Sequence, residues 1–75
     1  SFEGTYMKII YSDHAEKRMG QRGITRLEVE HVLKYAKFIV KTKKNRKIAI
    51  GEVNDKPLKV IFLEKENYKK IITIR

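Results

Sequence analysis

A chain of 75 residues is long enough for one small domain with a single hydrophobic core. It has no cysteine, which excludes disulfides and thiolate metal sites, and an apolar fraction of 41% argues against a disordered chain. Lysine and arginine number 18 against 9 acids, and the resulting net charge of +9 favours an anionic partner such as nucleic acid or an acidic protein.

The cellular location is predicted from what the sequence lacks. No apolar run approaches the roughly 20 residues needed to cross a bilayer, and the first residues do not resemble a signal peptide. We therefore expect a cytoplasmic protein without membrane contacts. Met7 looks like a natural start, so residues 1–6 are interpreted as an added extension and residues 7–75 as a single domain.

The first predicted elements are a short apolar segment and a helix. Residues 6–11 favour a strand or an extended lead-in, and either Ser12 or Asp13 can cap the helix that follows. We expect this helix to run to about residue 21 and to end near Gly23, because glycine adopts the left-handed conformation of a helix terminus at little cost.

A second helix begins with a capping box. Thr25 is the expected N-cap and Glu28, three residues later, completes the T-x-x-E pattern. Ile24, just before the cap, is expected to pack against Val29 as a hydrophobic staple. Apolar residues then continue at helical spacing through Val29, Val32, Leu33 and Ala36.

From residue 38 the pattern changes to β-branched runs of strand length. The four runs cover residues 38–42, 47–53, 58–64 and 69–75, and their short connections predict an antiparallel meander. The expected fold class is α+β, with two N-terminal helices packed on a four-stranded antiparallel sheet, to which residues 6–11 would add a short strand. Apolar residues on both faces predict that the 58–64 strand is central and covered on both sides.

Three residues of the first helix are candidates for phosphate chemistry. His14, Arg18 and Arg22 fall on one helical stripe, where the two arginines repel each other unless an anion lies along them. Arginine can hold two phosphate oxygens, and histidine transfers protons near neutral pH, so the three supply catalytic candidates for cleaving RNA at a 2′-hydroxyl. The alternatives are capping or core-edge roles and non-catalytic anion binding.

Other basic and aromatic residues are candidates for RNA binding. The densest basic run, residues 41–47, lies in a predicted hairpin turn, where its charges are either solvated or placed along a phosphate backbone. Tyr68 either stacks on a base or closes the core edge. His31 is more simply explained as a structural residue of the second helix. The RNA-binding candidates are Lys17, Lys43, Lys44, Arg46, Lys47, Tyr68 and Arg75.

No metal or cofactor site is predicted. Two histidines, no cysteine and acids without ligand spacing do not make a metal set, and no glycine-rich phosphate loop is present.

Residues 14–24 follow the pattern H-A-x-x-R-M-x-x-R-G-I, continued by Thr25 and Glu28 and by strand patterns from Gly51 and Ile71. This pattern resembles an uncharacterised domain-of-unknown-function family of small bacterial and archaeal proteins. That family is distantly similar to RelE and BrnT toxins of type II toxin–antitoxin pairs, which are small basic α+β proteins that cut mRNA.

The resemblance implies that residues 7–75 form a RelE/BrnT-like domain. It also implies an RNA-cleaving toxin neutralised by an antitoxin, with His14, Arg18 and Arg22 as the positions that carry over. The leading hypothesis is therefore a metal-independent endoribonuclease that binds RNA and an acidic antitoxin. The alternatives are a non-catalytic nucleic-acid-binding module and a small basic protein that docks an acidic partner.

Overall fold

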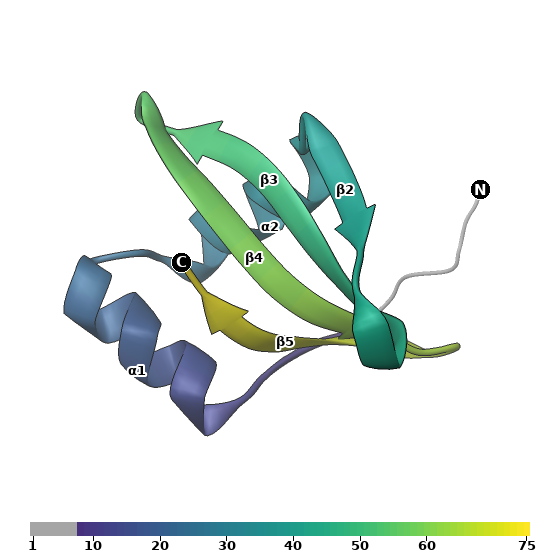
Figure 1. The fold of residues 1–75 in the computed structure, drawn as a ribbon. Helices are drawn as coiled ribbons and strands as arrows, with labels where there is room; N and C mark the ends of the chain where they lie inside the picture. Colours follow the sequence, from purple (N-terminus) through teal and green to yellow (C-terminus); the bar gives the residue numbers. More distant parts are fainter. Residues whose placement is uncertain (1–7) are drawn as a thin grey trace.

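The computed structural model describes residues 8–75, so the interpretation of residues 1–6 lies outside the described residues. Helices and strands follow one another along the chain as shown in Figure 1. Their order is β1 (Lys8–Tyr11), α1 (Asp13–Arg22), α2 (Arg26–Tyr35), β2 (Phe38–Lys41), a 3-10 turn (Lys43–Asn45), β3 (Arg46–Val53), β4 (Lys56–Glu64) and β5 (Tyr68–Ile74).

The predicted α+β class is confirmed, and the sheet has one more strand than the predicted meander. Strands β2 to β5 form that meander, and β1 adds a fifth strand in the order β1-β5-β4-β3-β2. The antiparallel four-stranded meander and the short N-terminal strand are thus both present, and the sheet is mixed because β1 pairs parallel to β5, which the sequence did not predict. The chain passes from β1 at one edge of the sheet to β2 at the other edge through both helices. This long connection lets β1 run parallel to β5.

Capping residues mark the start of both helices and the end of α1. Ser12, and not Asp13, caps α1, since its hydroxyl oxygen accepts from the Ala15 N–H at 3.0 Å. The helix ends before Gly23, which has φ 66°. The capping box of α2 is present as predicted: the Thr25 N–H donates to Glu28 Oε1 at 2.8 Å, and the Glu28 N–H donates to the Thr25 hydroxyl at 3.2 Å.

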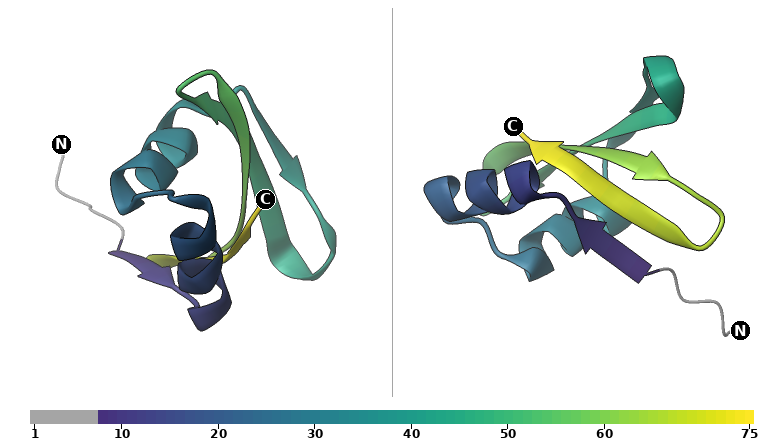
Figure 2. Two further views of the ribbon diagram at one scale, coloured as in Figure 1. Left: turned by 90° about the vertical axis from the view of Figure 1, so that its left-hand side faces the viewer. Right: turned by 90° about the horizontal axis from the view of Figure 1, so that it is seen from below.

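The two helices lie on the same face of the sheet (Figure 2). Gly51 is buried beneath α2, and a methyl group in place of its Cα hydrogen would lie 3.4 Å from Val32, in ordinary van der Waals contact. The core between the helices and the sheet contains only apolar side chains among its buried members: Ala15, Met19, Val29, Val32, Ala49, Leu58, Val60, Phe62, Ile71 and Ile74.

The opposite face of the sheet carries no helix, and we call it the open face (Figure 2). The prediction that β4 is covered on both sides is therefore wrong, although β4 is central. Ile61 is nevertheless only 9% exposed. It is flanked in the sheet by Ile48 and Thr73, and such neighbours shield a side chain in a central strand.

The end of β5 is held by α1 where β1 no longer pairs with it. A bulge at Ile72 turns both Ile71 and Ile74 toward the core. Beyond the last β1 pair, the Ser12 hydroxyl donates to the Ile72 carbonyl at 2.7 Å and Arg18 Nε donates to the Ile74 carbonyl at 3.3 Å. These bonds place α1 beside the last residues of the sheet.

Candidate nucleic-acid interface

The predicted catalytic stripe of α1 is on the surface beside the end of β5. His14 and Arg22 are exposed, and Arg18 between them is partly buried. The Nε–H of Arg18 donates to the Ile74 carbonyl, which is a structural role. Its two terminal amino groups have no protein partner in residues 8–75 and can still bind an anion as a fork.

Two further cations face each other at the same end of the sheet. The backbones of Lys59 and Arg75 bond reciprocally, with N–H to carbonyl distances of 2.9 and 2.8 Å. Val60 and Ile74 next to them point into the core, so strand alternation directs Lys59 and Arg75 to the open face. Like charges directly opposite each other destabilise a sheet, and a bound anion would remove that cost.

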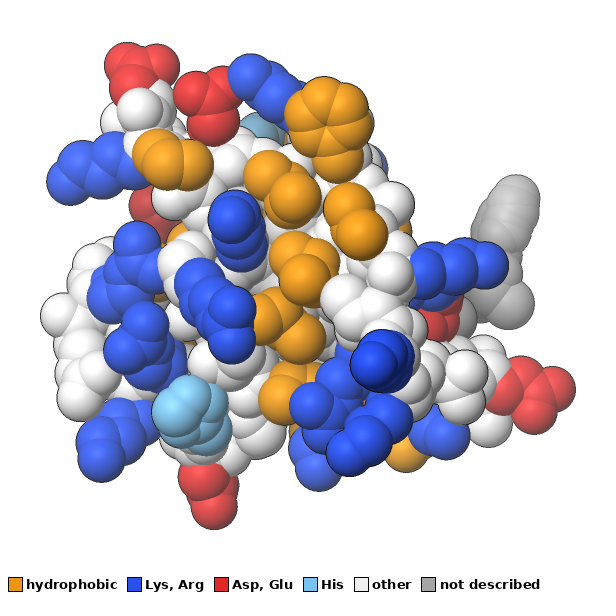
Figure 3. Space-filling view, viewed as in Figure 1, with side chains coloured by type: hydrophobic (Ala, Val, Ile, Leu, Met, Phe, Trp, Pro, Cys, Tyr) orange, Lys and Arg blue, Asp and Glu red, His pale blue; other side chains and the backbone are white. Residues whose placement is uncertain are grey.

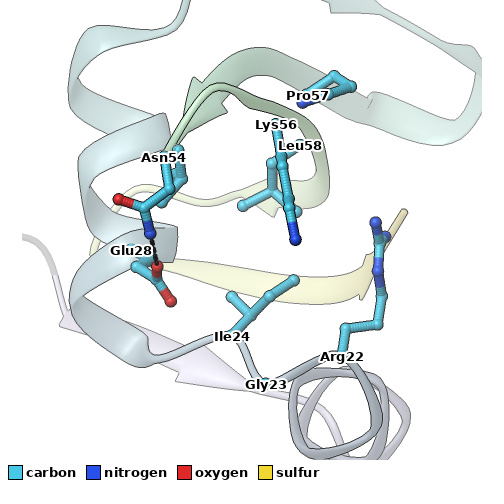
Figure 4. A pocket seen from close by; sticks show the side chains of 9 residues that line it. Arg22, Gly23, Ile24, Glu28, Asn54, Lys56, Pro57 and Leu58 are labelled. Atoms are coloured by element: carbon cyan, nitrogen blue, oxygen red, sulfur yellow. Dashed lines mark hydrogen bonds between the residues drawn. The ribbon is translucent and has the colours of Figure 1, made fainter.

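A cavity of about 300 Å³ lies between the α1–α2 connection and the β3–β4 hairpin. Arg22 and Lys56 extend into this space above Ile24 (Figure 4). On the opposite wall, Glu28 Oε2 accepts from Asn54 Nδ2 at 3.3 Å. The cavity therefore has a cationic side toward α1 and a hydrogen-bonded polar side toward α2.

We call the set of long basic side chains at this end the basic corner. It joins α1, β4 and the end of β5, and it consists of Arg18, Arg22, Lys56, Lys59 and Arg75. Within residues 8–75 none of the five forms an ion pair. A concentration of unpaired cations on one surface is the arrangement that attracts phosphate groups.

Beside the basic corner, an apolar band crosses the open face (Figure 3). The strand pairings of β2, β3 and β4 place its six residues on this face: Phe38, Val40, Ile48, Ile50, Ile61 and Leu63. Lysine and arginine side chains lie on both sides of the band. The open face thus combines apolar contact area with cationic margins.

A family model described as "Domain of unknown function (DUF4258)" matches residues 11–75. The chain belongs to this family. No curated protein matches the chain, and neither does any solved structure. The match starts at Tyr11 and includes both helices, the basic corner and strands β2 to β5 of the DUF4258 domain.

The remaining RNA-binding candidates of the DUF4258 domain do not form one cluster. Lys43, Lys44 and Arg46 are exposed at and after the 3-10 turn, where Lys44 has φ 63°. Lys17 is exposed on α1, whereas Tyr68 is partly buried at the start of β5. Of the seven candidates, only Arg75 belongs to the basic corner.

Lys47 is placed differently from its neighbours in the basic run. It is paired with Phe62 across the strands and therefore lies on the helix-covered face, where its ammonium group bonds to Glu64. Lys69 also approaches Glu64, at 3.8 Å. The hydrogen bond from Lys47 lowers the pKa of Glu64, and the charges of both lysines add to this effect. Lys47 is thus engaged within the protein.

Two residues of the basic corner, Lys56 and Lys59, were not among the functional residues predicted from the sequence. Both lie in β4 and stand out only when β4 is placed beside α1 and β5. Alternation along β4 could have assigned Lys59 to the face opposite Val60, but it could not have paired it with Arg75.

His31 and the acidic residues of the described chain do not form a second candidate site. His31 is exposed on α2, and its ring lies 4.9 Å from that of Tyr35. No group of three or more histidine and acidic side chains that could hold a metal ion occurs in the described part of the chain. No helix of that part is both long and apolar enough to cross a membrane.

Proposed function

We propose that this DUF4258 domain is a metal-independent endoribonuclease toxin of a type II pair that binds RNA at the basic corner. The observation that carries the proposal is the set of five cations, contributed by three elements, that have no carboxylate partner in residues 8–75. The resemblance of the H-A-x-x-R-M-x-x-R-G-I pattern to proteins similar to RelE and BrnT supports the toxin class.

RNA would enter along the basic corner and the edge of the apolar band. Arg18 and Arg22 hold the scissile phosphate, and Lys59 and Arg75 hold a neighbouring one, because each pair is adjacent in the fold. His14, one helical turn before Arg18, takes the 2′-hydroxyl proton. The 2′-oxygen then bonds to phosphorus while the bond to the 5′-oxygen breaks, and that oxygen leaves with a proton from the solvent.

The test is cleavage of a panel of short RNAs by the purified protein and by His14→Ala. We expect the substitution to lower the cleavage rate by about 10²-fold or more while RNA affinity stays within about twofold. His31→Ala is the matched control, since this exposed histidine of α2 lies outside the basic corner. Undiminished cleavage by His14→Ala would exclude His14 as the proton-transfer residue.

A non-catalytic nucleic-acid-binding module is the second candidate, and the same cations favour it. For four to six phosphate contacts, RNA affinity should fall with salt with a log–log slope of about −3 to −5. Intact RNA together with this slope would establish binding without cleavage. A flat salt response would exclude both functions at the basic corner.

A further inference from the structure

Exposed apolar side chains also occur away from the basic corner. Six large apolar side chains are exposed in residues 8–75, and five of them belong to α2 and β2. The five are Leu27, Tyr35, Phe38, Ile39 and Val40. Phe38, Ile39 and Val40 are consecutive in β2, and an exposed apolar segment on a small, highly charged protein marks an interaction site.

Strand β2 is also an open edge of the sheet, visible at the end of the strand order in Figure 1. The Thr42 N–H donates to the Arg46 carbonyl at 2.8 Å. Because backbone groups alternate in direction along a strand, Val40 and Phe38 also direct theirs toward β3. Ile39 and Lys41 must then direct their N–H and carbonyl groups outward. These four groups can pair with an incoming strand.

The side chains of β2 do not protect this edge. Phe38, Ile39 and Val40 are 65%, 55% and 46% exposed, and Lys41 is the only charged residue of the strand. Phe38 and Val40 continue the apolar band of the open face, while Ile39 lies on the helix-covered face. Edge strands are normally shielded by charges, bulges or covering elements, so an exposed apolar edge implies a partner.

The charges around β2 indicate what that partner is. Lys37 is already paired with Glu52, but Lys34, Lys41, Lys43 and Lys44 have no carboxylate partner in the described chain. A second copy of this chain would bring its own charge of +9 against these lysines. An acidic segment instead matches both the surrounding charge and the free backbone groups.

We infer that β2 binds an extended acidic segment of a partner protein, which adds a sixth strand to the sheet. Alternate apolar side chains of that segment would cover Phe38 and Val40, and its acids would meet Lys41 and the lysines of the 3-10 turn. If the proposed toxin function holds, the segment belongs to the antitoxin, and that assignment rests on the proposed function. Strand addition itself does not depend on RNA cleavage.

A synthetic peptide of about eight residues that alternates valine with glutamate is the probe. Its binding to the purified protein is measured by fluorescence anisotropy, beside a valine–lysine peptide of the same length. We expect only the acidic peptide to bind. Failure of the acidic peptide to bind, or equal binding of the basic peptide, would overturn the inference.

Backbone methylation of the acidic peptide tests the strand geometry without altering the protein. Two versions carry N-methyl groups on alternate residues in opposite frames, so that one blocks the amides facing β2 and the other blocks those facing solvent. We expect one version to lose at least about tenfold in affinity and the other to bind as before, because a strand pairs through every second residue. Equal effects of the two versions would overturn strand addition.

Variants of the protein locate the peptide on the sheet. Ile39→Lys and Val40→Lys should each weaken acidic-peptide binding by about tenfold or more. Ile10→Lys is the matched control, because Ile10 is 36% exposed on β1 at the opposite edge. Circular dichroism confirms that each variant folds. Loss of binding in Ile10→Lys but not in Val40→Lys would overturn the assignment to β2.

Sedimentation of the protein alone tests a second copy as the occupant. We expect a monomer at all concentrations used for peptide binding. A dimer that Val40→Lys dissociates would assign β2 to self-association and overturn the inference. RNA cleavage assays on Ile39→Lys keep the two proposals separate, because Ile39 lies on the helix-covered face, outside both the basic corner and the apolar band.

Discussion

The two faces of the sheet differ in how completely their apolar side chains are buried and their charged side chains are paired. On the helix-covered face the core residues of β3, β4 and β5 are buried, and charges such as Lys47 and Glu64 are paired. On the open face the apolar band is partly exposed, and Lys59 and Arg75 lie opposite each other without acids. Folding free energy therefore comes mainly from the covered face, and the open face is available for binding.

The largest expected difference between the faces concerns stability. Ile71→Ala, at a fully buried position of β5, should lower the free energy of unfolding by about 2–5 kcal/mol. Val40→Ala, on the exposed edge strand, should lower it by less than about 1 kcal/mol. Urea denaturation measures both values. Equal losses would show that the open face contributes to the core as much as the covered face does.

A charge reversal on the open face should separate binding from stability. Lys59→Glu should lower RNA affinity by about tenfold, because it removes a phosphate contact and adds repulsion. It should leave the protein as stable or more stable by about 0.2–1 kcal/mol, since the introduced carboxylate would attract Arg75 across the strands. Binding titrations and thermal denaturation measure the two effects.

The matched control for this charge reversal is Lys34→Glu on α2, outside the basic corner. The expected RNA affinity of that variant is within about twofold of the original. A parallel loss of affinity in both variants would mean that net charge, and not the basic corner, governs binding.

Tyr11 also lies on the helix-covered face, and its buried hydroxyl has no hydrogen-bond partner among residues 8–75. Burial raises the pKa of Tyr11, and the charge of Glu30 adds to this, while Arg26 opposes it. Tyr11→Phe removes the unpaired hydroxyl and should raise the free energy of unfolding by about 1 kcal/mol, as measured by urea denaturation at neutral pH.

The same residue predicts a loss of stability at alkaline pH. A raised pKa in the folded state favours the protonated phenol, so stability falls as pH rises above the ordinary value of 10.0. In Tyr11→Phe this contribution should be absent. A steeper alkaline loss in the variant than in the original protein would contradict the assignment.

The smallest expected effect is the acid dependence of the pair Lys47–Glu64. Because the pKa of Glu64 is lowered in the folded protein, the pair stabilises it above the ordinary pKa of 4.5 and is lost as pH falls through the lower folded value. Lys47→Met should reduce this acid dependence. Denaturation midpoints at a series of acidic pH values test it, with Lys65→Met, at an exposed lysine, as the control.

Local sequence signals were sufficient for the individual elements. The T-x-x-E box located the start of α2 and Gly23 the end of α1, because capping depends on residues within one helical turn. β-branched runs located the four strands of the meander for a similar reason. The stripe of His14, Arg18 and Arg22 on α1 was also a local inference, and the structure places His14 and Arg22 on its exposed surface.

Three features needed the tertiary structure: the parallel pairing of β1 with β5, the uncovered second face of β4, and the meeting of Lys59 with Arg75. Each depends on which segments distant in sequence lie side by side and in what register. A shift of one residue would turn Lys59 to the other face. The sequence by itself determined the elements and the excess of positive charge, whereas packing both helices on one side decided where that charge was left unpaired.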